Sequence, residues 1–413
     1  MSNENKLFGL AAEGGRWIFV ILCLVMYLCL GSVYSYSVFL PEIKKMPDVT
    51  AFLGNLPFMI FLAFFSIMMF FGGRLMEKLG PKKLALIGGV IVGLGWALSY
   101  VSVQMQSIYM LILTYGVVAG SGVGLTYGAP VAIAAKWFPD KKGLAVGLML
   151  AGFGGSALIT ANLAQVLIPS VGLGMTFLYF GIAFAIILVI LALPLSVPVA
   201  GWKPAGWNPP AGAASSIDFD SGEMTKTSSF WGLFLCYLFG CIAGLMAIGV
   251  SKSVGNEMIK IDGATGSMLV GIFAIFNAVG RPLFGTLTDK LAPKGAAIIN
   301  LVLMLVVSVM MLLAGEGDVT LYVIAFCGFW LSLGGWLAIA PTSTATFFGM
   351  KNYARNYGVV FFAYGLGAII GGIISGQAKD AFGSYQVAFY PTAALAVLGL
   401  ILTVLFIKTP AKK

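Results

Sequence analysis

Long apolar runs separated by short polar segments are the dominant pattern in this chain. Each run is about 20 residues or longer, enough to cross the hydrocarbon core of a bilayer as a helix. Twelve such runs lie at residues 17–40, 53–77, 84–104, 108–136, 143–168, 173–197, 230–253, 265–288, 296–315, 319–348, 355–378 and 385–407. They are continuous and rich in glycine and aromatic residues, unlike the alternating strands of a membrane β-barrel. The pattern predicts an all-α membrane protein with twelve transmembrane helices.

A polar segment at residues 198–229 divides the runs into two groups of six. We expect an N-terminal six-helix half at 17–197 and a C-terminal half at 230–407, joined by this central loop. The polar tails are residues 1–16 and 408–413. No cleavable signal peptide is predicted, because the start is polar and the first run is too long for a signal-peptide core.

The two halves carry an internal repeat. The string GRLMEKLGPK at residues 73–82 matches GTLTDKLAPK at residues 285–294, and each string ends the second run of its half. A weaker match pairs Phe153-Gly154 with Tyr364-Gly365. Chance similarity between apolar segments does not explain the ordered acid-Lys-Leu-small-Pro-Lys pattern. Parallel six-helix repeats predict a substrate site near the bilayer midplane, between the halves.

The charge distribution predicts how the chain is oriented. Charged residues make up 9% of the sequence, against about 25% in a soluble domain. Of the 24 Lys and Arg residues, 18 lie in the tails and in loops on the same side of the predicted membrane. This bias predicts cytoplasmic termini and a multi-pass protein of the plasma (inner) membrane. It also argues against a nucleic-acid partner, although the net charge is +9.

Motifs for enzymatic chemistry are missing. The chain has no histidine, so it has no Ser-His-Asp arrangement and no histidine metal site, and it has no phosphate-binding P-loop. Its five cysteines all fall inside apolar runs, which is typical of buried free thiols. We therefore expect no enzyme activity, metal or cofactor. The central loop is too short for a nucleotide-hydrolysing domain, so an ATP-driven pump is also excluded.

Arg281 is the only charged residue in the middle of a predicted span. It lies eight residues before Asp289, or about 12 Å from the cytoplasmic end of its helix, in an apolar core about 30 Å thick. No acid in any span is placed to neutralise it, and an unpaired guanidinium at this depth costs at least roughly 2.5–3.5 kcal/mol. The simplest partner is an anionic substrate that arrives from water and leaves again. The alternative is a structural Arg that binds backbone carbonyls.

Polar and aromatic side chains at similar depth are candidate neighbours of Arg281. Asn277 precedes it by one helical turn on the same face. Tyr127 and Tyr364 each lie about 15 Å from the cytoplasmic ends of their helices. The predicted substrate-binding set is Arg281, Asn277, Tyr34, Tyr127, Tyr364 and Phe361. Interhelical packing explains each tyrosine equally well, and it explains Phe361 better.

The repeated string resembles the loop signature of the major facilitator superfamily. In that family a glycine and an acid lock neighbouring helices on the cytoplasmic side. The resemblance assigns this conformational role to Gly73 and Glu77 in the first half, and to Gly285 and Asp289 in the second. It implies a major facilitator fold with two six-helix halves that alternate access to a central site.

Three further segments resemble the monocarboxylate transporters of this superfamily. They are EGGRW at residues 13–17, KWFPDKKGLAVG at 136–147 and GRPLFG at 280–285. The second also resembles the bacterial oxalate/formate antiporters. The resemblance covers essentially the whole chain and implies a bacterial lactate carrier whose Arg281 binds the substrate carboxylate. Two departures affect proton handling: Asn277 replaces an acid of the animal members, and Tyr34 replaces their first-span lysine.

Together these observations predict a secondary transporter of small monocarboxylates, such as lactate and pyruvate, by proton symport. The proton would reside on an acid such as Glu257, or travel with the substrate as the neutral acid. The oxalate antiporters carry a second cation on span eleven, where this chain has Tyr364, so one cation favours monocarboxylates. The alternatives are an anion exchanger without proton coupling and a carboxylate receptor that does not transport. The sequence predicts no oligomeric state.

Overall fold

The computed structural model describes residues 6–199, 202–205 and 218–408. In that part of the chain a two-stranded antiparallel ribbon, β1 (Lys6–Leu7) and β2 (Leu10–Ala11), is followed only by helices. The α-helices are α1 (Ala12–Leu30), α2 (Tyr36–Ile43), α3 (Ala51–Gln104), α4 (Ile108–Leu111), α5 (Gly120–Trp137), α6 (Lys142–Ala192), α7 (Ser221–Met224), α8 (Ser228–Ser253), α9 (Gly263–Leu313), α10 (Val319–Phe348), α11 (Tyr353–Val360), α12 (Phe362–Phe382) and α13 (Phe389–Phe406). Short 3₁₀ or π segments are η2 (Gly31–Ser35), η3 (Ile112–Ala119), η4 (Val254–Ile259) and η5 (Tyr385–Ala388).

Within the described residues, ten helices are long and apolar enough to cross a membrane. Two of them, Leu144–Ala192 and Gly263–Leu313, have 49 and 51 residues. A straight helix of that length extends about 75 Å, more than twice the thickness of the hydrocarbon core. Each contains one residue with non-helical backbone, Gly172 or Ala292, where the chain can fold back. Counting the two arms of each separately gives twelve apolar segments, the number that the sequence predicts.

The repeated string forms the same turn in both halves. Gly80 has φ 77° and ψ 161°, and its counterpart Ala292 has φ 57° and ψ 166°. Proline follows each of them and starts the next helix, where its missing N–H costs no hydrogen bond. This backbone region is essentially restricted to glycine. The second half therefore holds a strained alanine where the first half has glycine.

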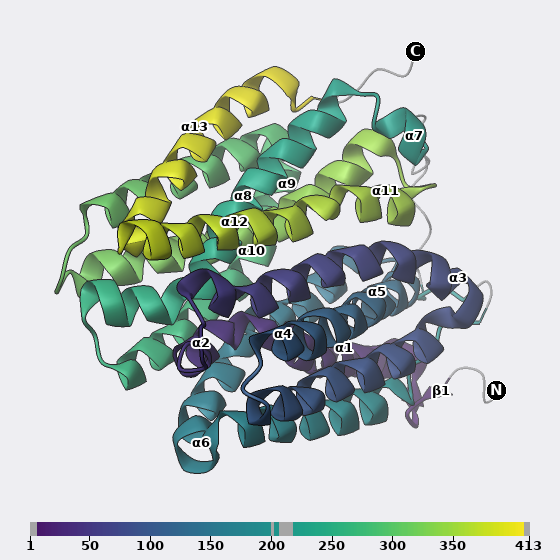
Figure 1. Cartoon of the computed structure of the whole chain (residues 1–413). Helices are drawn as coiled ribbons and strands as arrows, with labels where there is room; N and C mark the ends of the chain where they lie inside the picture. The colour runs from purple at the N-terminus through teal and green to yellow at the C-terminus, as the bar shows by residue number, and fades with distance from the viewer. Residues whose placement is uncertain (1–5, 200–201, 206–217, 409–413) are drawn as a thin grey trace.

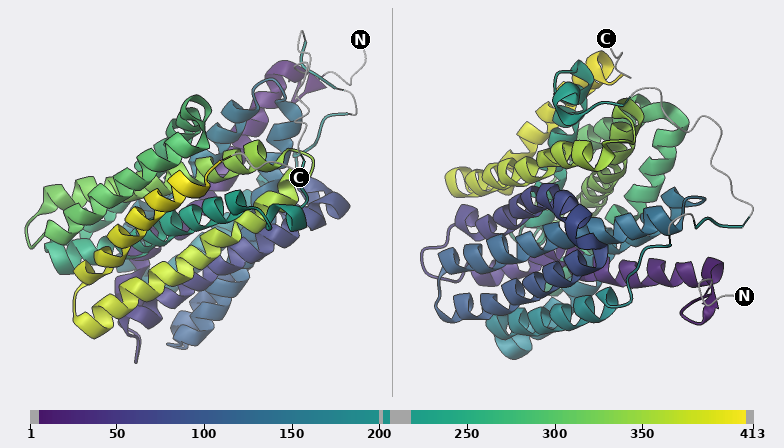
Figure 2. Two further views of the ribbon diagram at one scale, coloured as in Figure 1. Left: turned by 90° about the horizontal axis from the view of Figure 1, so that it is seen from above. Right: turned by 90° about the vertical axis from the view of Figure 1, so that its right-hand side faces the viewer.

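The elements group into two bundles (Figure 1). Helices α1 to α6 lie together, and α8 to α13 lie together on the other side. Both described termini lie at one end of the molecule, which Figure 2 shows from two further directions. The bundles meet mainly along two helix pairs, α3 with α12 and α6 with α9. We call the end with Arg16 and Lys408 the tail end and the other end the opposite end.

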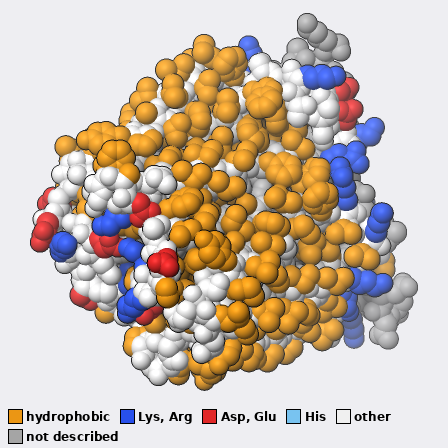
Figure 3. Space-filling model, viewed as in Figure 1, with side chains coloured by type: hydrophobic (Ala, Val, Ile, Leu, Met, Phe, Trp, Pro, Cys, Tyr) orange, Lys and Arg blue, Asp and Glu red, His pale blue; other side chains and the backbone are white. Residues whose placement is uncertain are grey.

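A broad hydrophobic belt surrounds the visible face between two charged ends (Figure 3). Large apolar side chains that are exposed in the described part of the chain include Leu94, Ile186, Ile190, Leu313 and Leu405. Apolar surface of this extent is unstable in water and marks contact with lipid. The belt agrees with the prediction of a membrane protein.

The structure differs from the sequence prediction at the start of the first helix and in the central segment. Helix α1 begins at Ala12 rather than at residue 17, because Glu13 and Arg16 make contacts that allow polar residues in its first turn. The central segment contains the short helix α7, which starts with a capping box formed by Asp220 and Glu223. The predictions for residues 1–5, 200–201, 206–217 and 409–413 concern positions outside the described residues.

Candidate functional site

Arg281 lies on α9 between the two bundles and is only 4% exposed. Its Nη2 donates a long hydrogen bond of 3.5 Å to Oδ1 of Asn277, while Nε and Nη1 have no hydrogen-bond partner. No carboxylate among the described residues lies within ion-pair distance of it. The buried guanidinium therefore keeps free donors and an uncompensated charge.

Asn277 is held in one orientation. Its Nδ2 donates to the backbone oxygen of Trp330 at 3.0 Å, which leaves Oδ1 facing Arg281. Gly154 of α6 lies against the same side chain, since a Cβ at this glycine would be 2.7 Å from Oδ1. Asn277 thus positions the guanidinium of Arg281 and accepts a hydrogen bond from one of its donors, Nη2.

The predicted tyrosines converge on this guanidinium. The hydroxyls of Tyr34 in η2 and Tyr364 in α12 lie 2.8 Å apart and form a hydrogen bond between the two bundles. Tyr34 and Tyr127 both contact the ring of Phe153, which also lies against the guanidinium of Arg281. Counting residues along each helix therefore identified positions that are far apart in sequence but close in the structure.

Phe361 forms part of the wall around this group. Its ring is stacked on Tyr364 with centroids 4.9 Å apart, and it lies 6.2 Å from the ring of Tyr127. The ring is fully buried. It packs against the tyrosines, as the sequence favoured.

The side chain that covers Arg281 was not among the residues predicted from the sequence. The guanidinium carbon lies 5.6 Å from the ring centre of Phe153 on α6, within the range of a cation–π contact. Phe153 also meets Tyr34 and Tyr127 edge to face. The internal repeat could have pointed to Phe153. Phe153-Gly154 is the counterpart of Tyr364-Gly365, and Tyr364 was already a predicted site residue.

Comparison with known proteins connects this geometry to a family. The profile of the Major Facilitator Superfamily matches residues 20–346 and 257–413. The chain belongs to the Major Facilitator Superfamily. It is therefore a transporter and not an enzyme, and its all-helical fold is the one predicted.

Related transporters are similar at low identity. The chain is 28% identical over 425 residues to the oxalate:formate antiporter of Oxalobacter formigenes, covering 100% of this chain and 97% of that protein. It is 25% identical to monocarboxylate transporter 13 of Rattus norvegicus over 79% of this chain and 74% of that one. Among solved structures, a bacterial homologue of the lysosomal transporter Spinster, in an inward-facing and unoccupied conformation, has a TM-score of 0.68 and 16% identity. It covers 95% of this chain and 94% of that chain, and it supports the fold alone.

The halves of this major facilitator are linked mainly at the middle and the opposite end. There Glu257 of η4 is paired with Lys44 at 2.8 Å and with Lys379 at 2.7 Å. Asp380 accepts hydrogen bonds from the backbone N–H groups of Ala51 and Phe52, at the start of α3. These contacts join both bundles, so the described conformation is closed at the opposite end.

The residues predicted to lock the tail end are not engaged here. A Cβ at Gly73 would meet nothing within 4 Å, and one at Gly285 would only reach Ala338 at 4.0 Å. Asp289 is exposed and makes no ion pair or hydrogen bond within the described part of the chain. The side chain of Glu77 lies outside the described residues. Their gating role stays a prediction.

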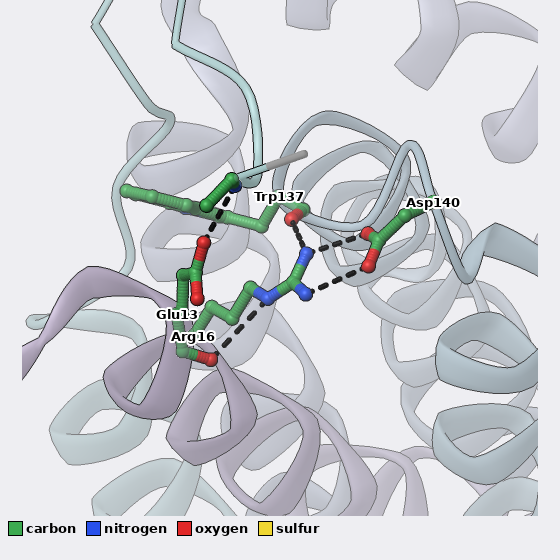
Figure 4. A network of polar contacts seen from close by, with 5 residues as sticks. Glu13, Arg16, Trp137 and Asp140 are labelled. Atoms are coloured by element: carbon green, nitrogen blue, oxygen red, sulfur yellow. Dashed lines mark hydrogen bonds and ion pairs between the residues drawn. The ribbon is translucent and has the colours of Figure 1, made fainter. Parts of the chain in front are cut away.

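Two of the segments that resemble monocarboxylate transporters contact each other at the tail end (Figure 4). Arg16 makes a bidentate pair with Asp140 at 2.6 and 2.8 Å, and it also donates to the backbone oxygen of Trp137. Its guanidinium lies 4.7 Å from the ring centre of Phe138. The hydrogen bonds from Arg16 hold the pKa of the Asp140 carboxyl below its usual range. The network fastens α1 to the segment between α5 and α6.

Proposed function

We propose that this transporter carries small monocarboxylates, such as lactate and pyruvate, by proton symport with alternating access. The observation that supports it most is the buried Arg281 guanidinium, whose Nε and Nη1 lack partners. A guanidinium presents a planar fork that matches the two oxygens of a carboxylate. A bound carboxylate would supply both the missing hydrogen bonds and the missing charge.

The surroundings of Arg281 favour a small anion with one carboxylate. The rings of Phe153, Tyr127 and Phe361 leave a mostly apolar wall for a short carbon chain. The hydroxyls of Tyr34 and Tyr364 offer partners for a hydroxyl or keto oxygen. Arg281 is the single cation of this group in the described residues, which suits one carboxylate better than two.

The proton is assigned to the substrate rather than to a protein acid. The chain has no histidine, and Glu257 is already held by Lys44 and Lys379 at the opposite end. We propose that anion and proton move together as the equivalent of the neutral acid. The termini are placed in the cytoplasm and the protein in the plasma (inner) membrane, because the basic residues gather at the tail end.

The moving parts follow the predicted halves, residues 17–197 and 230–407. We propose that Gly73, Glu77, Gly285 and Asp289 lock the tail end when the opposite end opens. In the described conformation the opposite end is closed, and Gly73 and Gly285 make no close contact with the other bundle. Substrate then exchanges with Arg281 from the tail side.

The second candidate function is exchange of monocarboxylates or oxalate without a proton. It is favoured by the full-length similarity to a protein named as an oxalate:formate antiporter. Purified protein in liposomes tests both functions with radiolabelled lactate, pyruvate, acetate, formate and oxalate, with and without a pH gradient. Symport predicts uptake driven by an inward proton gradient into empty vesicles. Exchange predicts uptake that ignores the gradient and requires internal anion. Binding without flux would instead indicate a receptor.

A further inference from the structure

Lys252 is a second buried cation without a carboxylate partner. It lies near the end of α8, at the opposite end of the molecule, and is 8% exposed. Its Nζ makes one hydrogen bond, to Oε1 of Gln165 at 3.2 Å, and no described carboxylate lies within ion-pair distance. An ammonium has three donors, so two of them remain available.

The neighbouring acids are occupied by other lysines. Glu42 is the acid that acts electrostatically on Lys252, but its carboxylate is paired with Lys45 at 2.6 Å. Glu257 follows on the next turns and is held by Lys44 and Lys379. Lys252 is thus not neutralised by a dedicated partner.

Polar side chains converge beside Lys252. Oε1 of Gln165 also accepts a hydrogen bond of 2.5 Å from Oγ of Ser267, which is fully buried. The amide oxygen of Asn256 is buried nearby with no hydrogen-bond partner. Lys252 and Asn256 both flank Gly266, since a Cβ there would lie 3.4 Å from Lys252 Cγ and 2.8 Å from Asn256 Oδ1. The cluster therefore keeps hydrogen-bonding groups without a partner, namely Oδ1 of Asn256 and two of the three donors of Lys252.

The cluster lies on the helix pair that reaches Arg281. Ser267 and Arg281 are both on α9, 14 residues apart, so about 21 Å separates them along the helix. Gln165 and Gly154 are both on α6, and Gly154 packs against Ala278 beside the site. The interface between α6 and α9 therefore extends from the cluster around Lys252 to Arg281.

We propose that Lys252 and Ser267, which Gln165 covers in the described conformation, form a second carboxylate site that a substrate anion occupies before Arg281 when it enters from the opposite end. The Lys252–Gln165 bond joins α8 to α6, and hence the two bundles. When the bundles separate at this end, the bond breaks and frees the ammonium. A carboxylate then takes the place of the Gln165 oxygen on Lys252. This inference rests on the proposed function.

The test compares transport from the two sides. Initial rates of lactate uptake are measured in right-side-out and inside-out membrane vesicles that contain Lys252→Met. We expect the KM for entry at the opposite end to rise about tenfold, while the KM for entry at the tail end stays within twofold. Lys252→Arg keeps the charge and should restore the first KM to within about threefold of wild type. Lys260→Met, which removes an exposed lysine at the same end, is the matched control.

Several outcomes would overturn the proposal. Equal KM increases from both sides would make Lys252 a structural residue, and unchanged values would remove it from the pathway. A rise of the same size in Lys260→Met would indicate general charge attraction. Gel filtration in detergent checks that each variant is folded. Absence of carboxylate transport by the wild type would instead sink the proposed function, which separates the two failures.

Discussion

The guanidinium of Arg281 lies over the ring of Phe153, which belongs to the other bundle, at 5.6 Å. A buried cation in this position gains from the negative face of the ring, although the ring cannot neutralise it. The contact therefore holds the guanidinium in place when no anion is bound. It also links the candidate site to α6, a helix that packs along α9.

Replacing Arg281 by Lys should abolish most carboxylate uptake, at least a tenfold loss in kcat/KM. Lysine keeps the charge but not the planar fork that binds two oxygens at once. Uptake into proteoliposomes measures the loss, and Arg355→Lys on the exposed surface is the control. Near-normal transport by the Arg281 variant would contradict the assignment.

Phe153→Leu should raise the KM by roughly 2- to 30-fold. Leucine fills much of the space but lacks the ring face, and cation–π contacts contribute about 0.5–2 kcal/mol. The lipid-facing Phe71, which is exposed, provides the matched control Phe71→Leu. An unchanged KM would show that the ring only packs.

The hydrogen bond between Tyr34 and Tyr364 predicts a non-additive pair of variants. Removing either hydroxyl leaves the other buried and unpaired, which costs about 1–3 kcal/mol. Tyr34→Phe and Tyr364→Phe should each lower thermal stability in detergent, whereas the double variant should lose less than the sum. Tyr109→Phe, at an exposed position, should change nothing. Strict additivity would argue that the two hydroxyls act independently.

Asp140→Asn should destabilise the protein by about 1–3 kcal/mol at neutral pH, because the charge-assisted bonds to Arg16 are lost. The pKa of Asp140 is lowered in the folded protein. Its stabilisation is therefore present above the unfolded pKa of 3.8 and disappears as the pH falls through the folded value.

Thermal unfolding from pH 7 down to pH 3 should show the wild-type advantage shrinking only below about pH 4. Asp48→Asn, at an exposed residue, is the control for removal of one charge. An advantage that is constant across this range would contradict the linkage to Asp140.

Ala292→Gly should stabilise the protein by about 1–3 kcal/mol, because alanine at φ 57° and ψ 166° occupies a region that only glycine adopts freely. The reverse change at the equivalent turn, Gly80→Ala, should destabilise it by a similar amount. Melting temperatures in detergent measure both effects. Equal melting temperatures for wild type and Ala292→Gly would show that the turn relaxes without cost.

The sequence predicted the parts of the site that depend on position along a helix. Counting residues placed Arg281, Tyr127 and Tyr364 at one depth. In the structure Tyr127 shares the neighbour Phe153 with Arg281 and the neighbour Phe361 with Tyr364. The contact of Phe153 with Arg281 depends instead on how two bundles face each other, which no single helix encodes. The burial of Lys252 was missed for the same reason, since its hydrogen-bond partner Gln165 is 87 residues away.

Contacts that form in only one conformational state could also not be predicted from the sequence. The family resemblance assigns Gly73 and Gly285 to a lock at the tail end, but it does not tell whether the lock is formed; a Cβ at Gly73 would meet nothing within 4 Å, and one at Gly285 would reach only Ala338. The ion pairs of Glu257 require three separate elements to meet at one end. A sequence specifies the residues of both states but does not tell which state is populated.

The two glycines that follow the paired aromatics have a mechanical consequence. Gly154 presses on Ala278 of the other bundle, and Gly365 presses on Ser66, so close that a methyl group would collide at either point. If the bundles rotate about these two contacts, either end of the molecule can open while the distance between the bundles at the two glycines stays constant. The size of the substrate that can pass would then be limited equally in both directions of transport.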